Sequence, residues 1–277
     1  MKKTFLSKKI LIIGASGTIG NYLFNSLRLA GARVDGTSRS KNKETFLYLD
    51  FFDLKSFEKF PWRKYDLIIN CAGSIDYQNT LAAARENIFV NVLAPLHILS
   101  QLDKNQVYFH CSTHVVTLPP SQQNSYSLSK LFFENYIGIL GNIKAKAVIL
   151  RIPGIFYENR ESGIIYSVKK HFQEKKPLVI DWTASTWHTM YLPRVIEIIL
   201  SLIKNNCSDK LVIIGYPTKT TMEKVLAAAK EAFGFSISIN FNAHKTNRYI
   251  PDVFAQKKYI KVTAQDFKND LISYFKK

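Results

Sequence analysis

The sequence has few of the features that mark proteins outside the ordinary globular class. Its 277 residues include only three cysteines, Cys71, Cys111 and Cys207, too few and too far apart for a disulfide framework or a zinc site. The apolar runs, such as 10–13, have the length of a strand and fall far short of the ~20 residues of a membrane helix. We therefore expect a cytoplasmic protein in a reducing compartment, with no metal site and no membrane span.

The net charge is +17, but the basic residues do not gather in clusters. The basic excess is divided almost evenly between residues 1–157 and 158–277, with no basic tail and no stripe of basic and aromatic residues. This dispersion argues against a nucleic-acid partner. A positive field still attracts small polyanions, such as a dinucleotide or a sugar nucleotide.

Strand-like and helical segments alternate along the first half of the chain. Continuous apolar runs rich in β-branched residues are typical of strands buried on both faces. Their alternation with helices predicts an α/β fold with a doubly wound, parallel, Rossmann-type sheet. The predicted strands are 9–13, 33–37, 45–49, 67–70, 106–111 and 146–152, and the predicted helices are 19–30, 81–101 and 125–140.

The pattern is looser after residue 157, where we expect a small, discontinuous C-terminal domain. The first domain would span residues 1–157, residues 187–216 would return to it, and residues 158–277 would form most of the second domain. The apolar run at 210–215 is the strand expected to rejoin the main sheet. The predicted helices in this half are 166–173, 193–204, 222–233 and 266–275.

Three glycines, Gly14, Gly17 and Gly20, lie between the first predicted strand and the first predicted helix. In a dinucleotide-binding loop, the first glycine allows the tight turn and the second lets the backbone approach a pyrophosphate. The third lets the helix pack on the strand, and the helix N-terminus then faces the phosphates. The strand–loop–helix context favours such a loop over a merely structural turn.

The end of the second predicted strand bears on the choice between NAD and NADP. An NAD-binding protein places a carboxylate there to accept a hydrogen bond from the ribose 2′-hydroxyl. Here the strand ends at Ser38–Arg39, and Asp35 lies too early in it. Because Arg39 can bind a 2′-phosphate, the sequence favours NADP(H) over NAD(H). Alternatively, Arg39 is a solvated loop residue and selectivity is lax.

Tyr126 and Lys130 open the helix predicted at 125–140, and Thr113 follows the preceding strand. Residues four apart lie on one helical face. We expect the Lys130 ammonium to lower the pKa of the Tyr126 phenol, so that both of its protonation states are reached near neutrality. This arrangement predicts acid/base chemistry beside the dinucleotide.

These motifs together resemble the extended, NAD(P)-dependent epimerase/dehydratase branch of the short-chain dehydrogenase/reductase superfamily. The resemblance is dense over residues 9–157 and weaker beyond, where 258–277 looks like the closing helix of the branch. The matching elements are Gly14, Gly17 and Gly20, Asp50 and its neighbour, Asn70 to Gly73, Asn91, Ser112 and Thr113, Tyr126 and Lys130, and Arg151 to Tyr157.

The resemblance implies a role for each matching residue. Tyr126 would be the general acid/base, Lys130 would hold the nicotinamide ribose, and Thr113 or its neighbour Ser112 would bond the reacting oxygen. Asp50 and Phe51 would hold the adenine, and Ala72 and Gly73 would line the cleft. The expected cofactor-binding residues are Gly14, Ser16, Gly17, Thr18, Ile19, Gly20, Ser38, Arg39, Asp50, Phe51, Cys71, Ala72, Gly73, Asn91, Tyr126, Lys130 and Ile152.

The sequence also departs from the pattern of this branch. Dehydratases of the branch carry an Asp–Glu pair where this chain has His114–Val115, so the machinery for elimination is missing. Trp187 stands where an arginine often contacts the diphosphate of a sugar nucleotide, and Arg194 replaces a usual aspartate. These changes affect the substrate assignment and leave the cofactor assignment untouched.

Members of the branch act mainly on nucleotide-linked sugars, which implies such a substrate here. The candidate substrate-binding residues are His114, Tyr157, Arg160 and His188, each of which has a structural alternative. Cys71 and Cys111 fall at strand ends, where we expect buried, inert thiols. The protein partner that we consider is a second copy of the chain, in a homodimer.

The leading hypothesis is an oxidoreductase of deoxysugar or polysaccharide biosynthesis. It would use NADPH to reduce a keto group on a nucleotide-linked sugar, with a 4-keto-6-deoxy sugar suggested by the family. An epimerase that retains NAD(P) is the alternative among enzymes, and an NADP-binding redox sensor without turnover is the alternative outside them.

Overall fold

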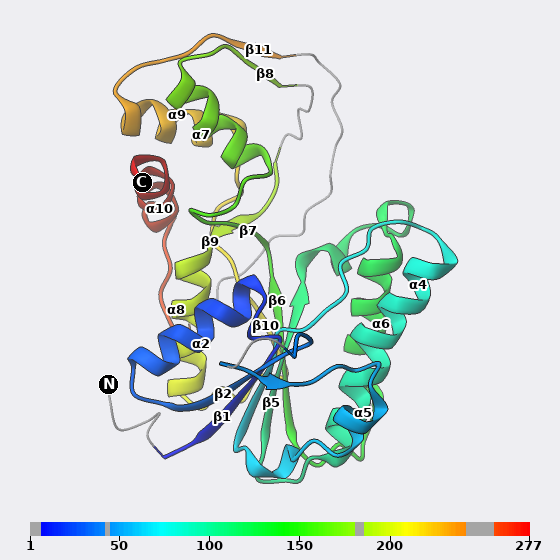
Figure 1. Ribbon diagram of the computed structural model, residues 1–277. Helices are drawn as coiled ribbons and strands as arrows, with labels where there is room; N and C mark the ends of the chain where they lie inside the picture. Colours follow the sequence, from blue (N-terminus) through cyan, green and yellow to red (C-terminus); the bar gives the residue numbers. More distant parts are fainter. Residues whose placement is uncertain (1–6, 42–44, 181–185, 242–257) are drawn as a thin grey trace. The chain divides into compact units, whose positions relative to one another are not determined.

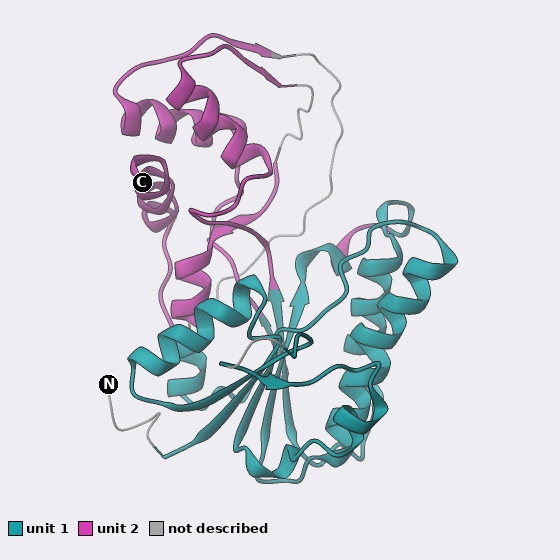
Figure 2. Ribbon diagram, in the orientation of Figure 1, with its two compact units in different colours: residues 1–116, 120–151, 199–212 teal, residues 117–119, 152–198, 213–277 magenta. Residues whose placement is uncertain are grey.

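The computed structural model describes residues 7–41, 45–180, 186–241 and 258–277. The chain forms two compact units, which are coloured separately in Figure 2. Unit 1 comprises residues 1–116, 120–151 and 199–212, and unit 2 comprises residues 117–119, 152–198 and 213–277. The two units are described one after the other below.

A seven-stranded sheet, in the order β10-β6-β5-β4-β1-β2-β3, is the framework of unit 1. β1 pairs in parallel with β2 and with β4, which confirms the predicted doubly wound α/β sheet. The chain runs outward from β1 in both directions, so a crevice opens at the carboxyl ends of β1 and β4. The strands are β1 (Lys9–Ile13), β2 (Arg33–Ser38), β3 (Leu47–Tyr48), β4 (Leu67–Asn70), β5 (Val107–Thr113), β6 (Lys146–Ile152) and β10 (Leu211–Ile213).

Helices cover both faces of this sheet (Figure 1). α2 (Thr18–Leu29) packs on one face through Leu23, Phe24 and Leu27, which recur at helical spacing and are buried. α4 (Leu81–Ile88), α5 (Ala94–Gln101) and α6 (Ser125–Ile139) lie on the other face, and the short α3 (Leu54–Glu58) follows β3. The two apolar layers bury the strands on both sides, which explains their continuous hydrophobic sequence.

The helix predicted at 81–101 forms, but its hydrogen-bond pattern changes in the middle. A π-helical turn, Phe89–Leu93, separates α4 from α5. Pro95 has no N–H to donate to the carbonyl of Asn91, four positions earlier, so the regular α-helical hydrogen-bond pattern is interrupted here. The turn places the Asn91 side chain in the interior, where it is fully buried.

Unit 2 is built of helices with two pairs of short strands. β7 (Gly154–Phe156) pairs with β9 (Thr189–Tyr191), and β8 (Leu178–Ile180) pairs with β11 (Ile239–Phe241). None of these strands was predicted, because three-residue strands carry no readable alternation of polar and apolar residues. The helices are α7 (Ile164–Glu174), α9 (Met222–Phe233), α10 (Ala264–Lys276) and the first part of α8 (Leu192–Lys204), whose last turns belong to unit 1.

Arg194 joins α8 to α10 within unit 2. Its guanidinium binds Asp270 through two hydrogen bonds of 3.0 and 3.1 Å, and the Tyr216 hydroxyl donates to the same carboxylate at 2.6 Å. Arg194 also bonds Glu197 at 2.7 Å. The arginine that departs from the family pattern therefore has a structural role that the sequence did not reveal.

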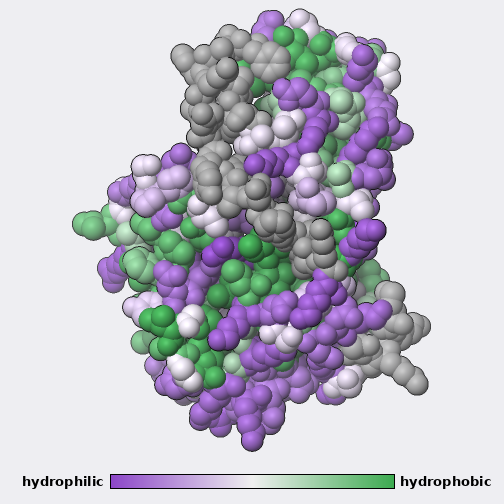
Figure 3. All heavy atoms as spheres, turned by 180° about the vertical axis from the view of Figure 1, so that it is seen from behind, coloured by the Kyte–Doolittle hydropathy of each residue, from purple (hydrophilic) through white to green (hydrophobic). Residues whose placement is uncertain are grey.

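The surface mixes polar and apolar residues. On the face drawn in Figure 3, hydrophobic residues form separate green patches between purple, hydrophilic ones. Among the described residues, no helix is both long enough and apolar enough to cross a membrane.

Candidate active site

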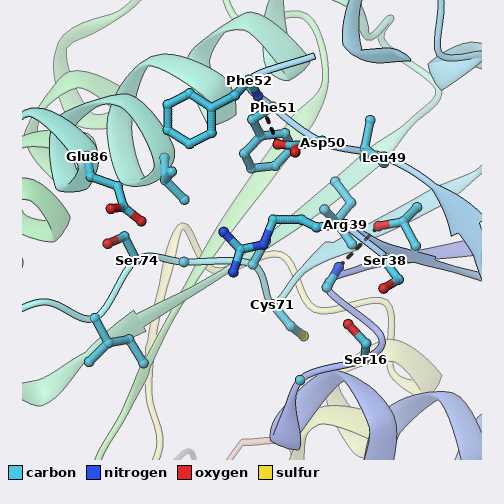
Figure 4. A pocket seen from close by; sticks show the side chains of 18 of the residues that line it. Ser16, Ser38, Arg39, Leu49, Asp50, Phe51, Phe52, Cys71, Ser74 and Glu86 are labelled. Atoms are coloured by element: carbon cyan, nitrogen blue, oxygen red, sulfur yellow. Dashed lines mark hydrogen bonds between the residues drawn. The ribbon is translucent and has the colours of Figure 1, made fainter. Parts of the chain in front are cut away.

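A pocket of about 520 Å³ lies in unit 1, at the carboxyl ends of β1, β2 and β4 (Figure 4). It occupies the crevice that the strand order creates. The residues lining it include ten of the seventeen predicted cofactor-binding residues: Gly14, Ser16, Gly17, Ser38, Arg39, Asp50, Phe51, Cys71, Ala72 and Gly73.

The glycine loop forms one wall of this pocket. Gly14 has φ +75°, and a Cβ there would lie 2.9 Å from the backbone nitrogen of Ala72. A Cβ on Gly20 would lie 2.2 Å from the Gly14 carbonyl oxygen. Gly17 begins α2 without a side-chain cap, and the first turn of the helix has no acidic residue. The positive end of α2 is thus open to an anion, and this cradle fits a pyrophosphate.

Arg39 projects into the same pocket from the end of β2. In Figure 4 its side chain extends from beside Ser38 across the pocket, with Ser74 and Glu86 on the opposite side. Asp35 is occupied elsewhere: it accepts a hydrogen bond of 3.0 Å from the Tyr65 hydroxyl. The end of β2 therefore presents a cation and no carboxylate, which fits a 2′-phosphate.

Tyr126 and Thr113 come together on the α6 side of β5. Tyr126 lies in the first turn of α6 and is only 8% exposed. The Thr113 side chain lies close enough to the phenol to lower its pKa, against the larger effect of burial, which raises it. The Tyr77 ring contacts the Tyr126 ring edge to face, with 5.4 Å between centroids. The α6 N-terminus is fixed by a capping box in which Asn124 and Ser127 bond each other's backbone.

Lys130 connects this group to the pocket. Its ammonium donates a hydrogen bond of 3.1 Å to the Cys111 carbonyl. The same nitrogen lies 3.3 Å from the point where a Cβ on Gly73 would be, and Gly73 lines the pocket. Lys130, four residues after Tyr126 on α6, thus stands beside the wall formed by the segment after β4.

The predicted effect of Lys130 on the Tyr126 phenol is wrong. Burial raises the pKa of Tyr126 to about 12, and the Thr113 side chain opposes that rise only in part. Burial also lowers the pKa of Lys130 to about 8, because the ammonium has lost its water. Tyr126 is therefore a protonated phenol near neutrality, the form that can donate a proton.

Ser112 does not join Tyr126, although the sequence treated it as an equivalent of Thr113. Its hydroxyl donates to Glu134 on α6 at 2.5 Å. Arg151 at the end of β6 holds the same carboxylate at 2.6 and 2.9 Å. Successive residues of a strand point to opposite faces, so only one of Ser112 and Thr113 can face Tyr126. The sequence analysis did not identify Glu134. Glu134 is the only acidic residue of α6, and this could have marked it as a partner for a polar group in the interior.

Seven predicted cofactor-binding residues do not line the pocket, Tyr126 and Lys130 among them. Thr18, Ile19 and Gly20 form the first turn of α2 behind the glycine loop. Asn91 lies in the π-helical turn, where its amide bonds the backbone of Ser74 at 3.0 and 3.1 Å and the Ser129 hydroxyl at 3.0 Å. Asn91 therefore holds the segment after β4 in place. The seventh, Ile152, is buried and belongs to unit 2.

A further asparagine, Asn87, was not anticipated. Its amide donates to the Asp76 carbonyl at 2.8 Å and to the Ser125 hydroxyl at 2.9 Å. Ser125 immediately precedes Tyr126, and Asp76 lines the pocket. Asn87 thus ties the pocket segment to the start of α6. Asn87 lies four residues before Asn91, and this spacing could have indicated that both side chains are on the same face of the helix.

The candidate substrate-binding residues are divided between the units. His114 is buried in the helical turn that follows β5 in unit 1. Arg160 and His188 line a pocket of about 160 Å³ in unit 2, together with Trp187. Arg160 donates to the Ile155 carbonyl at 2.7 Å, so part of its guanidinium is engaged. Tyr157 is half-buried in unit 2 and does not line that pocket.

Comparison with known proteins identifies one family. The model described as "NAD dependent epimerase/dehydratase family" matches residues 10–208. The "Putative UDP-glucose 4-epimerase" of Methanocaldococcus jannaschii is 23% identical over 254 residues, 82% of this chain and 83% of the relative. The CDP-abequose synthase of Salmonella muenchen is 20% identical over 255 residues, 86% of this chain and 85% of the relative.

Solved structures share the fold across both units. RMD from Pseudomonas aeruginosa complexed with NADPH has a TM-score of 0.74 at 13% identity, covering 97% of this chain and 99% of that chain. UDP-glucuronic acid 4-epimerase from Bacillus cereus in complex with NAD has a TM-score of 0.70 at 19% identity, with 97% and 98% covered.

Proposed function

This chain belongs to the NAD dependent epimerase/dehydratase family, and we propose that within it the protein uses NADPH to reduce a keto group of a nucleotide-linked sugar. A 4-keto-6-deoxy sugar is the substrate class that we favour. The single observation that carries the proposal is the pocket end of β2, where Arg39 extends across the cavity and no carboxylate is present. The fold and the family establish an oxidoreductase-type enzyme; the reaction and the cofactor preference are what we propose.

The pocket supports NADPH as the cofactor. Gly14, Gly17 and the open end of α2 would hold the pyrophosphate, and Arg39 would bind the 2′-phosphate. Lys130, beside Gly73, would hold the nicotinamide ribose. When bound, NADPH supplies a hydride. The NADPH complex of RMD supports this choice, whereas the NAD complex of the Bacillus cereus epimerase shows that the fold also accepts NAD.

Reduction of a ketone also requires a proton, which Tyr126 can supply. Its buried phenol stays protonated near neutrality, because burial raises its pKa to about 12. As the substrate carbonyl oxygen gains negative charge, the phenol proton would move from Tyr126 to that oxygen. Thr113, beside Tyr126, would orient that oxygen for the transfer.

The residues after β5 argue against dehydration. Elimination of a hydroxyl needs an acid and a base, and His114–Val115 supplies no carboxylate pair. The name of the CDP-abequose synthase places its product among nucleotide-linked sugars, which supports that substrate class here. Epimerisation with a retained cofactor is the second candidate, since another relative is named a 4-epimerase.

The test is an assay of purified protein with NADPH and a panel of nucleotide-linked 4-keto-6-deoxy sugars. We expect one NADPH oxidised per sugar reduced, read as loss of the nicotinamide absorbance and as product mass. Conversion of a non-keto sugar nucleotide to its epimer without net NADPH consumption would assign an epimerase. NADPH binding with no turnover of any sugar would assign a sensor. Tyr126→Phe is the control that separates enzymatic from chemical reduction.

A further inference from the structure

The geometry points to a site of reversible oxidation in the wall of the cofactor pocket: we propose that Cys71 and Cys111 form a disulfide when a peroxide enters the pocket. Both residues lie in unit 1, as does the pocket. The thiol chemistry stands independently of the proposed function. Only its consequence for NADPH binding rests on that function.

The sheet register places the two cysteines side by side. Asn70 of β4 pairs with His110 of β5 in a parallel ladder, so the next residue of each strand is Cys71 and Cys111. Their sulfurs are 3.7 Å apart. Neighbouring strands are about 4.8 Å apart, within the Cα separation of about 4.4–6.8 Å that disulfides span. Closing the bond needs a movement of the sulfurs toward about 2.05 Å.

The two thiols differ in access, and one of them has a nearby cation. Cys71 is half-buried and lines the pocket, whereas Cys111 is buried behind it. The hydrogen bond between the thiols lowers the pKa of Cys111 and raises that of Cys71, and the Lys130 ammonium also lowers the pKa of Cys111. Because the two sulfurs share one hydrogen bond, the pair titrates as a unit. An electropositive, partly accessible setting of this kind is typical of reactive cysteines.

The reaction balances with hydrogen peroxide as the oxidant. One of the two sulfurs attacks a peroxide oxygen as its thiolate; the O–O bond breaks, a sulfenic acid forms, and the hydroxide released takes a proton to give water. The other sulfur then attacks the sulfenic sulfur; the S–S bond forms as the S–O bond breaks, and the departing hydroxide takes the proton of that second thiol to give a second water. Two thiols lose two electrons, and one peroxide becomes two waters. A dithiol reductant reverses the oxidation by exchange.

Disulfide formation would alter the pocket itself. The segment from Cys71 to Gly73 packs tightly on the glycine loop, since a Cβ on Gly14 would lie 2.9 Å from the Ala72 nitrogen. The Cys111 carbonyl holds the Lys130 ammonium at 3.1 Å. Drawing the two sulfurs together therefore moves both the pocket wall and the acceptor that positions Lys130. We expect oxidation to weaken NADPH binding, and bound NADPH to slow oxidation of the pair.

The test compares the protein before and after treatment with hydrogen peroxide. We expect two of the three thiols to be lost, the intact mass to fall by two hydrogen atoms, and peptide mapping to link Cys71 to Cys111, all reversed by dithiothreitol. Cys207 is the third free cysteine; it is buried in unit 1 and does not line the pocket. Cys207→Ser is therefore the matched control and should behave like the parent. Cys71→Ser should form no disulfide after the same treatment.

The consequence is measured as NADPH affinity by fluorescence titration. Oxidation should raise the dissociation constant by about tenfold or more in the parent and in Cys207→Ser, and should leave it unchanged in Cys71→Ala. Three free thiols after peroxide, a disulfide that includes Cys207, or sulfinic acids without a disulfide would each overturn the proposal. Circular dichroism of each variant checks folding. Thiol counts and masses need no substrate, so failure of the proposed reaction would leave this test intact.

Discussion

Ser112 and Glu134 are joined by a hydrogen bond of 2.5 Å in the interior of unit 1, with the hydroxyl as donor. Thr113, the next residue, lies beside Tyr126 instead. The two neighbours therefore have separate roles, one in holding α6 to the sheet and the other in the candidate active site.

The first prediction separates these roles by substitution. Thr113→Ala should lower kcat by about 10- to 100-fold with little change in stability, because it removes the group that would orient the carbonyl oxygen. Ser112→Ala should leave kcat within a few fold and destabilise the protein by about 1.5–3 kcal/mol, because a hydrogen bond to a buried carboxylate is lost. Steady-state kinetics and urea unfolding give the two readouts. Equal kinetic losses in both variants would return Ser112 to the active site.

The second prediction concerns cofactor choice. Arg39→Ala should weaken NADPH binding by about 1.5–3 kcal/mol, the scale of a hydrogen bond between charged groups, and should leave NADH binding nearly unchanged. Calorimetric titration with both cofactors measures the difference. Lys41→Ala is the control, since that lysine lies over the Tyr48 ring outside the pocket lining. Parallel losses for NADPH and NADH would show that Arg39 does not select between them.

The third prediction concerns the proton donor. Tyr126→Phe should lower kcat by about 100-fold or more and leave the NADPH dissociation constant nearly unchanged. Its neighbour in space, Tyr77, provides the comparison: Tyr77→Phe keeps the ring contact and should keep activity. Turnover by Tyr126→Phe at the parental rate would remove Tyr126 from the mechanism.

The fourth prediction follows from the buried Lys130 ammonium, whose pKa falls from 10.5 to about 8 in the folded protein. Between pH 8 and 10.5 the unfolded chain holds a proton that the folded chain has lost, so stability rises with pH in this window. Below pH 8 the cost of burying the charge is fully present, on the order of 3 kcal/mol. Lys130→Met should therefore be more stable than the parent at pH 7 and should lack the rise above pH 8.

Urea unfolding of the cofactor-free protein at several pH values tests this dependence. Lys104→Met, at an exposed lysine of unit 1, controls for the loss of one positive charge. A Lys130→Met variant that is less stable than the parent at pH 7 would show that the hydrogen bond to Cys111 outweighs the cost of burial.

The fifth prediction concerns the arginine that departs from the family pattern. Arg194→Met and Asp270→Asn should each destabilise the protein by about 1.5–3 kcal/mol. The double variant should cost less than the sum of the two, because the groups bond each other. Thermal unfolding of the four proteins completes the cycle. Additive losses would mean that the pair contributes no coupling.

Local sequence patterns predicted the sheet and most of its helices. Runs such as β1 and β4 are almost entirely apolar because helices cover both faces of the sheet. The glycine loop predicted the turn into α2. The strand after residue 210 also joins the sheet, beside β6. Each of these elements is determined by residues close together in the chain, which is why periodicity alone could find them.

The features that were missed depend on contacts between distant residues. The pairing of Ser112 with Glu134 requires the register of α6 against β5, and the approach of Cys71 to Cys111 requires the register of β4 against β5. The expectation of inert thiols considered each cysteine alone. The pKa of Tyr126 was misjudged because burial, which raises it, cannot be read from a spacing of four residues.

The spacing of three charged or polar side chains on α6 limits how this chain can vary in length. Tyr126, Lys130 and Glu134 follow one another at intervals of four, and the Asn124 capping box fixes where the helix begins. One residue inserted after Lys130 would rotate Glu134 by about 100° around the helix axis, away from Ser112 and Arg151, while the phenol and the ammonium stayed in place. Insertions and deletions are therefore excluded from 126–134, even though the outer face of this helix is free to change its residues.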